Sequence, residues 1–351
     1  MKVKQKFTNK KKKCPALSRE GIGKGLSFSI VIPNYNGKNF LPNCLQSLLQ
    51  SIKNCPKSNF EIIIVDNGST DNSIQLVKDF FTKHKLQNLE SKILHLESNT
   101  GFAFAVNQGI KIAKYPYVCV CNNDLKLKND WFKIISQEIK NNQKNHKITT
   151  FFSTVLNYNG TKFESQGFEF NYSGKCTNIS NDKIFLASSI LHLKSNLVWG
   201  APAALIVYKK EIIQKIGAFD SDFFAYEEDV DLNLRLKNFG YQTLYIPQAI
   251  CYHLGGATSN RMGNFRNRMD AKNWIYIIIK NYPAKFIFKY FFPIIEQRLR
   301  NLSSLIKNTS IKKLPKDIIA TYGEVLFNLP KMFQKRRYTQ KMLKSNHDYW
   351  T

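Results

Sequence analysis

The segment SIVIPNYNG, residues 29–37, decides the fold of this chain. Its first four residues form a short apolar run of the kind found in parallel strands that are buried on both faces. Pro33 and Gly37 then end the run in a polar turn. The same order returns in EIIIVDNGSTD, residues 61–71, and in YVCVCNND, residues 117–124. Three such segments predict strands of one sheet, each ending in polar side chains.

The segments between these strands have the spacing of amphipathic helices. Apolar residues recur every three or four positions in residues 41–52, and helices are also expected over residues 73–83 and 103–113, with a strand at 93–96. Strands that alternate with helices predict an α/β fold whose mostly parallel sheet carries helices on both faces. Residues 150–198 lack this order and predict a β-rich excursion, after which a helix opened by acidic residues and a last strand are expected.

Three polar residues, Asn34, Asp66 and Asp124, follow the three best-defined strands. In open α/β sheets ligands bind at the carboxyl ends of the strands, so these side chains are expected on one rim. Asp66 suits a hydrogen bond from a base or ribose, and a turn carboxylate that caps the next helix is the simpler alternative. Asp124 and the amide oxygens before it suit Mg²⁺ or Mn²⁺, with an ordinary strand-end turn as the alternative.

Four acidic residues lie within five positions: Glu227, Glu228, Asp229 and Asp231. Closely packed like charges raise the pKa of at least one carboxyl, which suits a general base. A solvated acidic helix start is the alternative, but the aromatic residues immediately before the cluster argue against full exposure. His253 follows the last predicted strand and is a candidate metal ligand, with an ordinary surface or core histidine as the alternative.

The chain has 351 residues, enough for about two domains, and an unevenly distributed net charge of +27. Residues 1–26 carry 9 basic and 1 acidic residue, residues 27–260 carry 24 and 19, and residues 261–351 carry 19 and 5, which gives +8, +5 and +14. We therefore expect a disordered basic arm, an ordinary globular domain and a basic C-terminal extension. Basic ends predict contact with a polyanion, either nucleic acid or an anionic membrane face.

The composition excludes several classes of protein. With 43% hydrophobic and 22% charged residues the chain is neither disordered throughout nor collagen-like, and no apolar run is long enough for a polytopic membrane protein. Seven cysteines without a CxxC pair, and a start without a secretory signal, predict reduced thiols in a cytosolic protein. Cys119 and Cys121 alternate with valines and are expected in the core.

Residues 261–351 mix basic residues with aromatic and aliphatic ones, as around WIYIII at 274–279. Pro283 and Pro293 interrupt any long helix, so we expect short amphipathic helices that lie on an anionic membrane face without crossing it. The alternative is that these helices contact the globular domain or a second subunit. The oligomeric state stays open, with a homodimer among the options.

Taken in order, these segments resemble the family 2 glycosyltransferases of GT-A fold, and most closely their bacterial rhamnosyltransferase-like subgroup. The resemblance spans residues 28–260. The matching pieces are SIVIPNYNG, VDNGSTDNS, SNTGFAFAVNQGI, NNDLKL, GAFDSDFFAYEEDVDLNLRLKNFGYQTLYIP and HLGGATS. No single piece decides the resemblance, but the ordered set is specific.

The resemblance implies a nucleotide-sugar-binding fold and a role for each matching residue. Nucleotide contacts are implied for Pro33, Asn34, Asp66, Asn107 and Asn123. Metal ligands are implied at Asp124, in the place of the family's Asp-x-Asp motif, and at His253. The catalytic base is implied at Asp229, beside Glu228 and Asp231, and the acceptor side at Trp199, Gly200 and Ala201.

The implied reaction is an inverting single displacement, in which Asp229 takes a proton from the acceptor hydroxyl and Mg²⁺ or Mn²⁺ neutralises the departing nucleoside diphosphate. The chain lacks the Gln-x-x-Arg-Trp motif of processive members, which implies that one sugar is added per encounter. The metal motif has Asn at its first two positions, which lowers the expected ribose contact and metal affinity.

The subgroup implies a dTDP-deoxysugar donor such as dTDP-rhamnose, with a UDP-sugar as the alternative. The acceptor would be a lipid-linked or cell-envelope glycan, such as a polyprenyl-linked one, reached by a peripheral enzyme at the inner face of the plasma membrane. Two other functions compete: a basic nucleic-acid-binding protein, and a relative that binds nucleotide sugar without turning it over. Acidic clusters on one rim would repel nucleic-acid phosphates, and the presence of Asp124 and Asp229 argues against the inactive relative.

Overall fold

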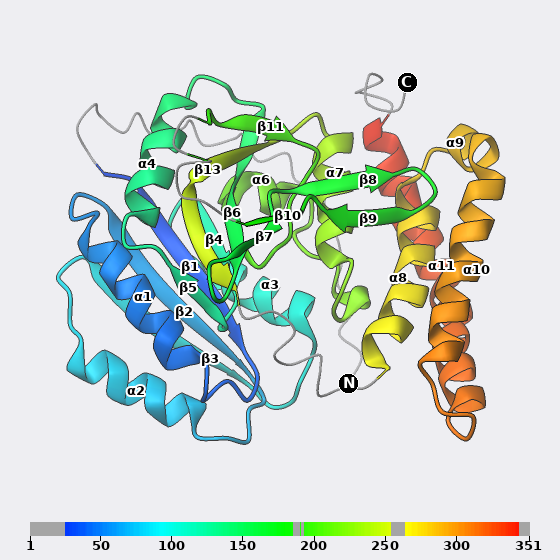
Figure 1. The fold of residues 1–351 in the computed structure, drawn as a ribbon, viewed down its shortest axis with the longest axis horizontal. Helices are drawn as coiled ribbons and strands as arrows, with labels where there is room; N and C mark the ends of the chain where they lie inside the picture. The colour runs from blue at the N-terminus through cyan, green and yellow to red at the C-terminus, as the bar shows by residue number, and fades with distance from the viewer. Residues whose placement is uncertain (1–24, 185–189, 191–192, 254–263, 344–351) are drawn as a thin grey trace, which may run out of the picture.

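The computed structural model describes residues 25–184, 190, 193–253 and 264–343. Most of the expected disordered arm, residues 1–26, and the part of the HLGGATS segment after His253 lie outside the described residues. The described chain forms a mixed α/β domain that is followed by a group of C-terminal helices (Figure 1). This arrangement confirms the predicted fold class and the helical C-terminal region.

The elements follow the predicted order closely. The strands are β1 (Ser27–Asn34), β2 (Asn59–Asn67), β3 (Leu89–Leu96), β4 (Tyr117–Cys121), β5 (Leu125–Leu127), β6 (Ile148–Asn157), β7 (Lys162–Ser165), β8 (Phe168–Asn171), β9 (Lys175–Asn178), β10 (Asn181–Ile184), β11 (Asn196–Val198), β12 (Leu205–Lys209) and β13 (Gln242–His253). The helices are α1 (Leu41–Lys53), α2 (Ser73–Lys83), α3 (Phe102–Ile112), α4 (Trp131–Asn141), α6 (Lys210–Lys215), the 3₁₀-helix η1 (Ser221–Phe223), α7 (Glu228–Asn238), α8 (Phe265–Asn281), α9 (Ala284–Lys289), α10 (Phe291–Lys307) and α11 (Leu314–Leu343).

The central sheet has the strand order β10-β7-β6-β12-β4-β1-β2-β3. Strands β3, β2, β1 and β4 pair in parallel, as expected for an α/β sheet. Strand β12 lies between β4 and β6 and runs antiparallel to both, so the sheet is mixed beyond β4. Strand β13 pairs in parallel with β6 and antiparallel with β5 and β11. The parallel half of the sheet is therefore the half whose strand ends form the predicted polar rim.

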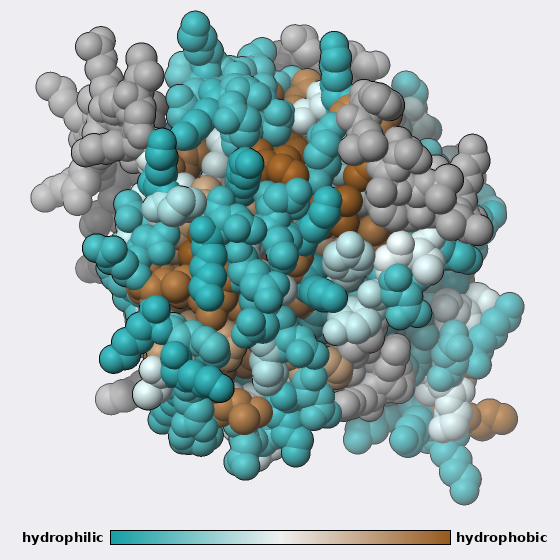
Figure 2. Space-filling view, turned by 60° about the vertical axis from the view of Figure 1, so that its left-hand side comes forward, coloured by the Kyte–Doolittle hydropathy of each residue, from teal (hydrophilic) through white to brown (hydrophobic). Residues whose placement is uncertain are grey.

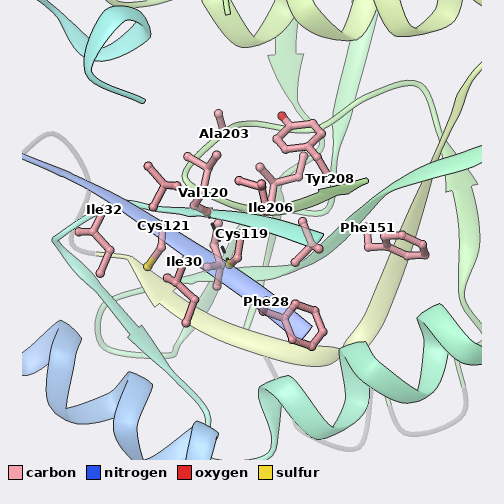
Figure 3. Packing of buried hydrophobic residues seen from close by; sticks show 14 of the residues in the cluster. Phe28, Ile30, Ile32, Cys119, Val120, Cys121, Phe151, Ala203, Ile206 and Tyr208 are labelled. Atoms are coloured by element: carbon pink, nitrogen blue, oxygen red, sulfur yellow. Dashed lines mark hydrogen bonds between the residues drawn. The ribbon is translucent and has the colours of Figure 1, made fainter. Parts of the chain in front are cut away.

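The register of this parallel half aligns the polar strand ends, because Asn34 on β1 is the partner of Asp66 on β2. The same sheet holds the main core, in which Ile30 and Cys119 are register partners on β1 and β4 and have no exposed surface. Figure 3 shows Val120 on the other side of the sheet from Cys119, as strand alternation requires. Cys119 therefore packs in the core, as the sequence predicted.

The β-rich excursion predicted for residues 150–198 is present as strands β6 to β11. Its turns are closed by backbone hydrogen bonds from Gly160 N–H to the Asn157 carbonyl at 2.8 Å and from Gly174 N–H to the Asn171 carbonyl at 3.0 Å. Strands β8 and β9 form a separate two-stranded sheet. The ring centroids of Phe170 on β8 and Trp274 on α8 are 6.3 Å apart, so this small sheet contacts the C-terminal helices.

Helix α8 joins the C-terminal helices to the α/β domain, because it contacts α7, α10 and α11. Its apolar run belongs to a second hydrophobic cluster together with Phe223, Val230 and Leu234. Trp274 and Tyr276 of that run are 3% and 0% exposed. The expectation that this run faces a membrane is therefore wrong. The alternative, a helix that packs on the globular domain, describes α8 correctly.

Buried charges reinforce the contact between α7 and α8. The Lys280 Nζ atom of α8 lies 2.6 Å from Asp220 and 2.7 Å from Asp231, and all three side chains are buried. Arg235 and Asn281 also donate to Asp231, each at 2.8 Å. Burial alone would raise the pKa of Asp231, but the charges of Arg235 and Lys280 outweigh it and hold the pKa below its ordinary value. The carboxylate therefore stays charged inside the protein, where its stability depends on these partners.

Most exposed large apolar side chains of the described residues lie on α9, α10 and α11. Phe288, Phe292 and Phe327 are 81%, 81% and 85% exposed. By contrast, Figure 2, which brings the left-hand side of Figure 1 forward, shows a mostly hydrophilic face with scattered hydrophobic patches. Among the helices that the structure describes, none is both long enough and apolar enough to cross a membrane.

We predict that Lys280→Met lowers the free energy of unfolding by about 3–5 kcal/mol, because it deprives two buried carboxylates of a positive partner. Urea unfolding followed by circular dichroism measures this change. Lys307→Met, at an exposed position of α10, is the matched control and should change stability by less than about 0.5 kcal/mol. Equal effects of the two substitutions would contradict a stabilising role for the buried lysine.

Candidate active site

A cavity of about 720 Å³ opens at the carboxyl ends of the central strands. This volume is typical of sites for small molecules. The predicted site residues on its wall are Pro33, Asn34, Asn123, Asp124, Glu228, Asp229 and His253. The wall, as far as the structure describes it, does not include Asp66, Asn107, Trp199, Gly200, Ala201 or Asp231. The cavity thus brings together the predicted metal ligands, the predicted base and part of the predicted nucleotide contacts.

Asn34 and Asn123 connect two strand ends beside the cavity. Asn123 Nδ2 donates to Asn34 Oδ1 at 2.8 Å, and Asn34 Nδ2 donates to Ser73 Oγ at 3.0 Å. The backbone at Gly37 passes so close that a Cβ atom there would lie 2.1 Å from Asn34 Oδ1. The two amide groups are thus held in fixed positions, which suits recognition of a polar ligand.

Asp66 and Asn107 lie near this rim but make contacts within the protein. Asp66 is 1% exposed; its Oδ2 pairs with His95 Nδ1 at 2.7 Å, and its Oδ1 accepts a hydrogen bond from Ser69 N–H at 3.3 Å. Asn107 Nδ2 donates to the Phe219 carbonyl at 2.7 Å, and its Oδ1 accepts from Phe219 N–H at 3.1 Å. Asn107 therefore joins α3 to the segment before η1, and direct nucleotide contact by either residue stays a prediction.

Asp124 and His253, predicted separately as metal ligands, lie side by side, with His253 Nε2 3.3 Å from Asp124 Oδ1. Glu164 of β7 pairs with the other ring nitrogen, Nδ1, at 2.6 Å. Burial lowers the pKa of His253, but the hydrogen bonds and charges of Asp124 and Glu164 outweigh burial and raise the pKa to about 10. A carboxylate on the outer nitrogen of a histidine fixes the orientation of the ring. Here the carboxylate of Glu164 holds the His253 ring so that Nε2 faces Asp124.

This group of side chains fits a divalent cation. Asp124 Oδ1 and Asn122 Oδ1 are buried and, apart from the 3.3 Å contact of Asp124 Oδ1 with His253 Nε2, accept no hydrogen bond within the described part of the chain. Carboxylate and amide oxygens suit Mn²⁺ or Mg²⁺, and the His253 ring can join them as a ligand once its Nε2 proton is displaced by the cation. The described residues contain no group of three or more His, Cys, Asp or Glu side chains arranged to hold a metal. Asp124 and His253 would therefore hold a cation whose other ligands include the phosphates of a bound ligand.

Asp229 lies in the first turn of α7, on the wall of the cavity. Its Oδ1 accepts a hydrogen bond from Val230 N–H at 2.8 Å, and its Oδ2 accepts one from Ala203 N–H at 3.2 Å. Burial raises the pKa of Asp229 to about 6 despite these donors. Burial also raises the pKa of the neighbouring Glu228 well above its ordinary value, with a contribution from the charge of Asp229. A half-buried carboxyl that titrates near neutral pH is suited to act as a general base.

The loop before α7 is strained and is held in place by α8. Phe224, Tyr226 and Glu227 have φ values of 65°, 64° and 63°, and such left-handed backbone costs about 1–3 kcal/mol for each residue other than glycine. Asn273 of α8 donates through Nδ2 to three carbonyls of this loop at 2.7 to 3.1 Å. Strain of this kind persists only where the surroundings enforce it, and it gathers at functional sites.

Asp231 has a different position from its neighbours in the acidic cluster. It has no exposed surface, and its carboxylate is occupied by Arg235, Lys280 and Asn281. Its contacts indicate that it anchors α7 to α8, whereas Asp229 lies on the cavity wall. A direct catalytic contact by Asp231 stays a prediction that these contacts do not support.

The predicted acceptor-side residues lie next to the cavity wall. Trp199 stacks on Phe170 with ring centroids 4.4 Å apart. A Cβ atom at Gly200 would lie 2.6 Å from Asn233 Cγ, so only glycine fits there. Ala201 exchanges hydrogen bonds with the Asn233 amide at 2.9 and 3.3 Å. The residues that line the cavity in this segment are the next three, Pro202, Ala203 and Ala204.

The sequence analysis did not identify Glu164, Arg266 or Asn273. Arg266 lines the cavity, and its guanidinium carbon lies 5.5 Å from the centre of the Tyr226 ring. Glu164 lies in the β-rich excursion, where apolar and polar residues do not alternate regularly enough to show which side chains share a face of the sheet. The position of Asn273 could have been noticed in the sequence. It precedes Lys280 by seven residues in a predicted helix, so the two side chains share a face of that helix. Buried polar side chains on one face need partners, and the acidic residues near α7 are candidates for that role.

The chain is similar in sequence to known proteins. A sequence model of the family described as Glycosyl transferase family 2 matches residues 29–216. The chain is 28% identical over 230 residues to the poly-beta-1,6-N-acetyl-D-glucosamine synthase of Staphylococcus epidermidis, a match that covers 66% of this chain and 50% of that protein. The chain thus spans about half the length of this curated relative.

A second relative comes from an archaeon. The chain is 22% identical over 222 residues to the dolichyl N-acetyl-alpha-D-glucosaminyl phosphate 3-beta-D-2,3-diacetamido-2,3-dideoxy-beta-D-glucuronosyltransferase of Methanococcus voltae, covering 63% of this chain and 65% of that protein. Among solved structures, GalNAc-T7 with UDP, GalNAc and Mn²⁺ superposes with a TM-score of 0.55 at 14% identity, covering 85% of this chain and 58% of that one. At this identity the structural likeness concerns the fold.

We predict that Asp124→Ala weakens Mn²⁺ binding in the presence of UDP by roughly tenfold or more, because the substitution removes a buried carboxylate oxygen from the cavity wall. Electron paramagnetic resonance of free Mn²⁺ measures the bound fraction. Asp79→Ala, at an exposed position of α2, removes the same charge and should leave binding unchanged. Equal Mn²⁺ affinity in Asp124→Ala and the unaltered protein would place the cation elsewhere.

Proposed function

Because the chain belongs to glycosyl transferase family 2, we propose that it moves one sugar per encounter from a nucleotide-sugar donor to a hydroxyl group of a glycan acceptor, with inversion at the anomeric carbon. The single observation that carries this proposal is the position of Asp229. Its carboxyl lies in the same cavity as Asn34, Asn123 and the Asp124–His253 pair. A base and a diphosphate-binding group on one cavity wall are what a single displacement needs. The nucleic-acid-binding hypothesis gains no support from the family match.

Asp229 would act on the acceptor. As a carboxylate it removes the proton from the attacking hydroxyl while the new bond forms between that oxygen and the anomeric carbon. The bond from the anomeric carbon to the phosphate oxygen breaks at the same time, and the nucleoside diphosphate leaves with the electron pair. The hydrogen bonds from Val230 and Ala203 to Asp229 hold the carboxylate in place for this step. A divalent cation held by Asp124 and His253 would neutralise the charge of the leaving diphosphate.

The donor and acceptor follow from the relatives and from the chemistry of the site. The UDP and Mn²⁺ in the GalNAc-T7 structure support a UDP-sugar donor with Mn²⁺ or Mg²⁺. The sequence resemblance to rhamnosyltransferase-like enzymes supports a dTDP-deoxysugar such as dTDP-rhamnose instead. The name of the Methanococcus relative specifies a dolichyl phosphate acceptor, which supports a polyprenyl-linked or envelope glycan here. We place the enzyme at the inner face of the plasma membrane, held by the basic and apolar surface of α9 to α11.

We predict that Asp229→Asn lowers the rate of sugar transfer by about 10²–10⁴-fold, because the amide cannot accept the proton, while nucleotide binding persists. The measurement is nucleoside diphosphate release from a panel of UDP-, GDP- and dTDP-sugars, after a thermal-shift screen has identified the donor. Asp79→Asn on α2 is the matched control. Retention of more than about a third of the activity by Asp229→Asn would remove Asp229 from the role of general base.

The raised pKa of Asp229 predicts an acidic limit to activity. The base works only as the carboxylate, so the transfer rate should be constant above pH 7 and should fall as the pH drops through about 6. Below that midpoint the rate should decrease about tenfold per pH unit. The pH dependence of kcat/KM tests this expectation. A rate that is flat down to pH 4.5 would contradict the pKa of about 6 assigned to Asp229.

A further inference from the structure

The turn between α10 and α11 combines exposed aliphatic and basic side chains. Ile311 in the turn is 89% exposed, and Ile319 at the start of α11 is 71% exposed. The exposed lysines around them are Lys307, Lys312, Lys313 and Lys316. Bulky aliphatic side chains beside lysines are typical of segments that lie at the surface of an anionic membrane. The charge of this turn is therefore complementary to anionic lipid.

A second cavity, of about 590 Å³, lies beside this turn. Its wall combines the start of α8 with the turn and the start of α11, and it includes the cations Arg268 and Lys313, the carboxylate of Asp317 and the hydroxyl of Ser310. Two cations against one carboxylate leave the wall with an excess of positive charge, which favours a phosphate over a neutral ligand. The positively charged wall of this cavity thus lies beside the exposed aliphatic and basic side chains of the turn.

Arg268 is incompletely paired in this cavity. Its Nη1 atom lies 3.6 Å from Asp317 Oδ1, a long ion pair. Its Nε atom is buried and has no hydrogen-bond partner among the described residues. A buried donor without a partner is unfavourable, so the contacts within the protein satisfy this guanidinium incompletely. Because Nε has no accessible surface, the donors that an anion in the cavity can reach are the terminal guanidinium nitrogens, whose ion pair with Asp317 is long.

The second cavity adjoins the active-site cavity, because Phe265 forms part of the wall of both. The ring of Phe265 also contacts Phe224 and Tyr226 of the strained loop, with ring centroids 5.8 and 6.1 Å apart. A molecule that extends from one cavity to the other would pass this ring. A ligand whose reacting group lies near Asp229 could therefore carry its charged group beyond Phe265.

We propose that the second cavity binds a phosphate group borne by a membrane lipid, while Ile311 and Ile319 enter the lipid surface. Arg268 and Lys313 provide the charge, and Ser310 provides a hydroxyl donor. That this lipid carries the sugar acceptor rests on the proposed function, whereas binding of the lipid phosphate does not. The proposal assigns the α10–α11 turn, and not the whole basic extension, as the part that selects the lipid.

The test is co-sedimentation of the full chain with vesicles of two compositions. Phosphatidylcholine is mixed with phosphatidic acid, whose phosphate is terminal, or with phosphatidylserine at the same surface charge. We expect tighter binding to phosphatidic acid, and we expect Arg268→Gln with Lys313→Gln to lower that binding by roughly tenfold or more. Lys78→Gln with Lys83→Gln on α2 removes the same charge from exposed positions and should have no effect.

Further variants keep the proposal falsifiable if the double substitution at Arg268 and Lys313 unfolds the protein. Lys313→Gln alone changes an exposed side chain and should still reduce the preference for phosphatidic acid. Ile311→Asp should reduce binding to both kinds of anionic vesicle. Equal binding to the two vesicle types, or equal losses in the α2 control, would overturn the proposal in favour of unselective charge attraction.

Two other results would assign the surface differently. In the first, calorimetry shows that inorganic phosphate binds, Ile311→Asp leaves this binding unchanged, and the protein does not bind vesicles. This result would assign the cavity to a soluble phosphate. Sedimentation velocity that shows a dimer broken by Ile311→Asp would assign the surface to a second copy of the chain. Either result would overturn the lipid proposal. None of these measurements requires sugar transfer, so the proposed function is tested separately.

Discussion

The buried contact of Lys280 with Asp220 and Asp231 is the interaction on which the rest of the structure depends. It joins α8, the first C-terminal helix, to α7, the helix that carries Asp229. Charges this deeply buried are stable only as a paired group, so α7 and α8 are fixed relative to each other. The C-terminal helices are therefore part of the structure that forms the active-site cavity.

The fixed position of α8 allows Asn273 to hold the strained loop before α7. Its hydrogen bonds to three loop carbonyls offset part of the cost of the left-handed backbone there. The loop brings Glu227 and Glu228 beside Asp229 in a partly buried cavity, and burial is the main cause of the raised pKa of Asp229. The chemistry proposed for that carboxyl thus depends on contacts made by a helix more than forty positions later in the chain.

The local sequence pattern predicted those strands and helices whose surroundings depend on residues nearby in the sequence. The polar ends of β1 and β2, and the pairing of Asn34 with Asp66, follow from apolar runs that stop at polar turns. The role of Asp231 could not be predicted in this way, because its partner Lys280 is 49 residues away. The net charge of residues 261–351 also misled the prediction of their surroundings, because it does not show which charges are paired with distant residues. The extension is strongly basic overall, yet Lys280 is buried in ion pairs and only part of the charge faces solvent.

The central claim is that α8 sets the environment of Asp229, and the pH dependence of sugar transfer by Asn273→Ala tests it most directly. Loss of the Asn273 hydrogen bonds should loosen the loop and admit water, so the acidic midpoint should move from about 6 toward the ordinary aspartate value of about 4. Asn267→Ala is the control on the same helix, because its side chain contacts Asn264 and Ser304 instead. A lower rate with the midpoint still near 6 would contradict the account.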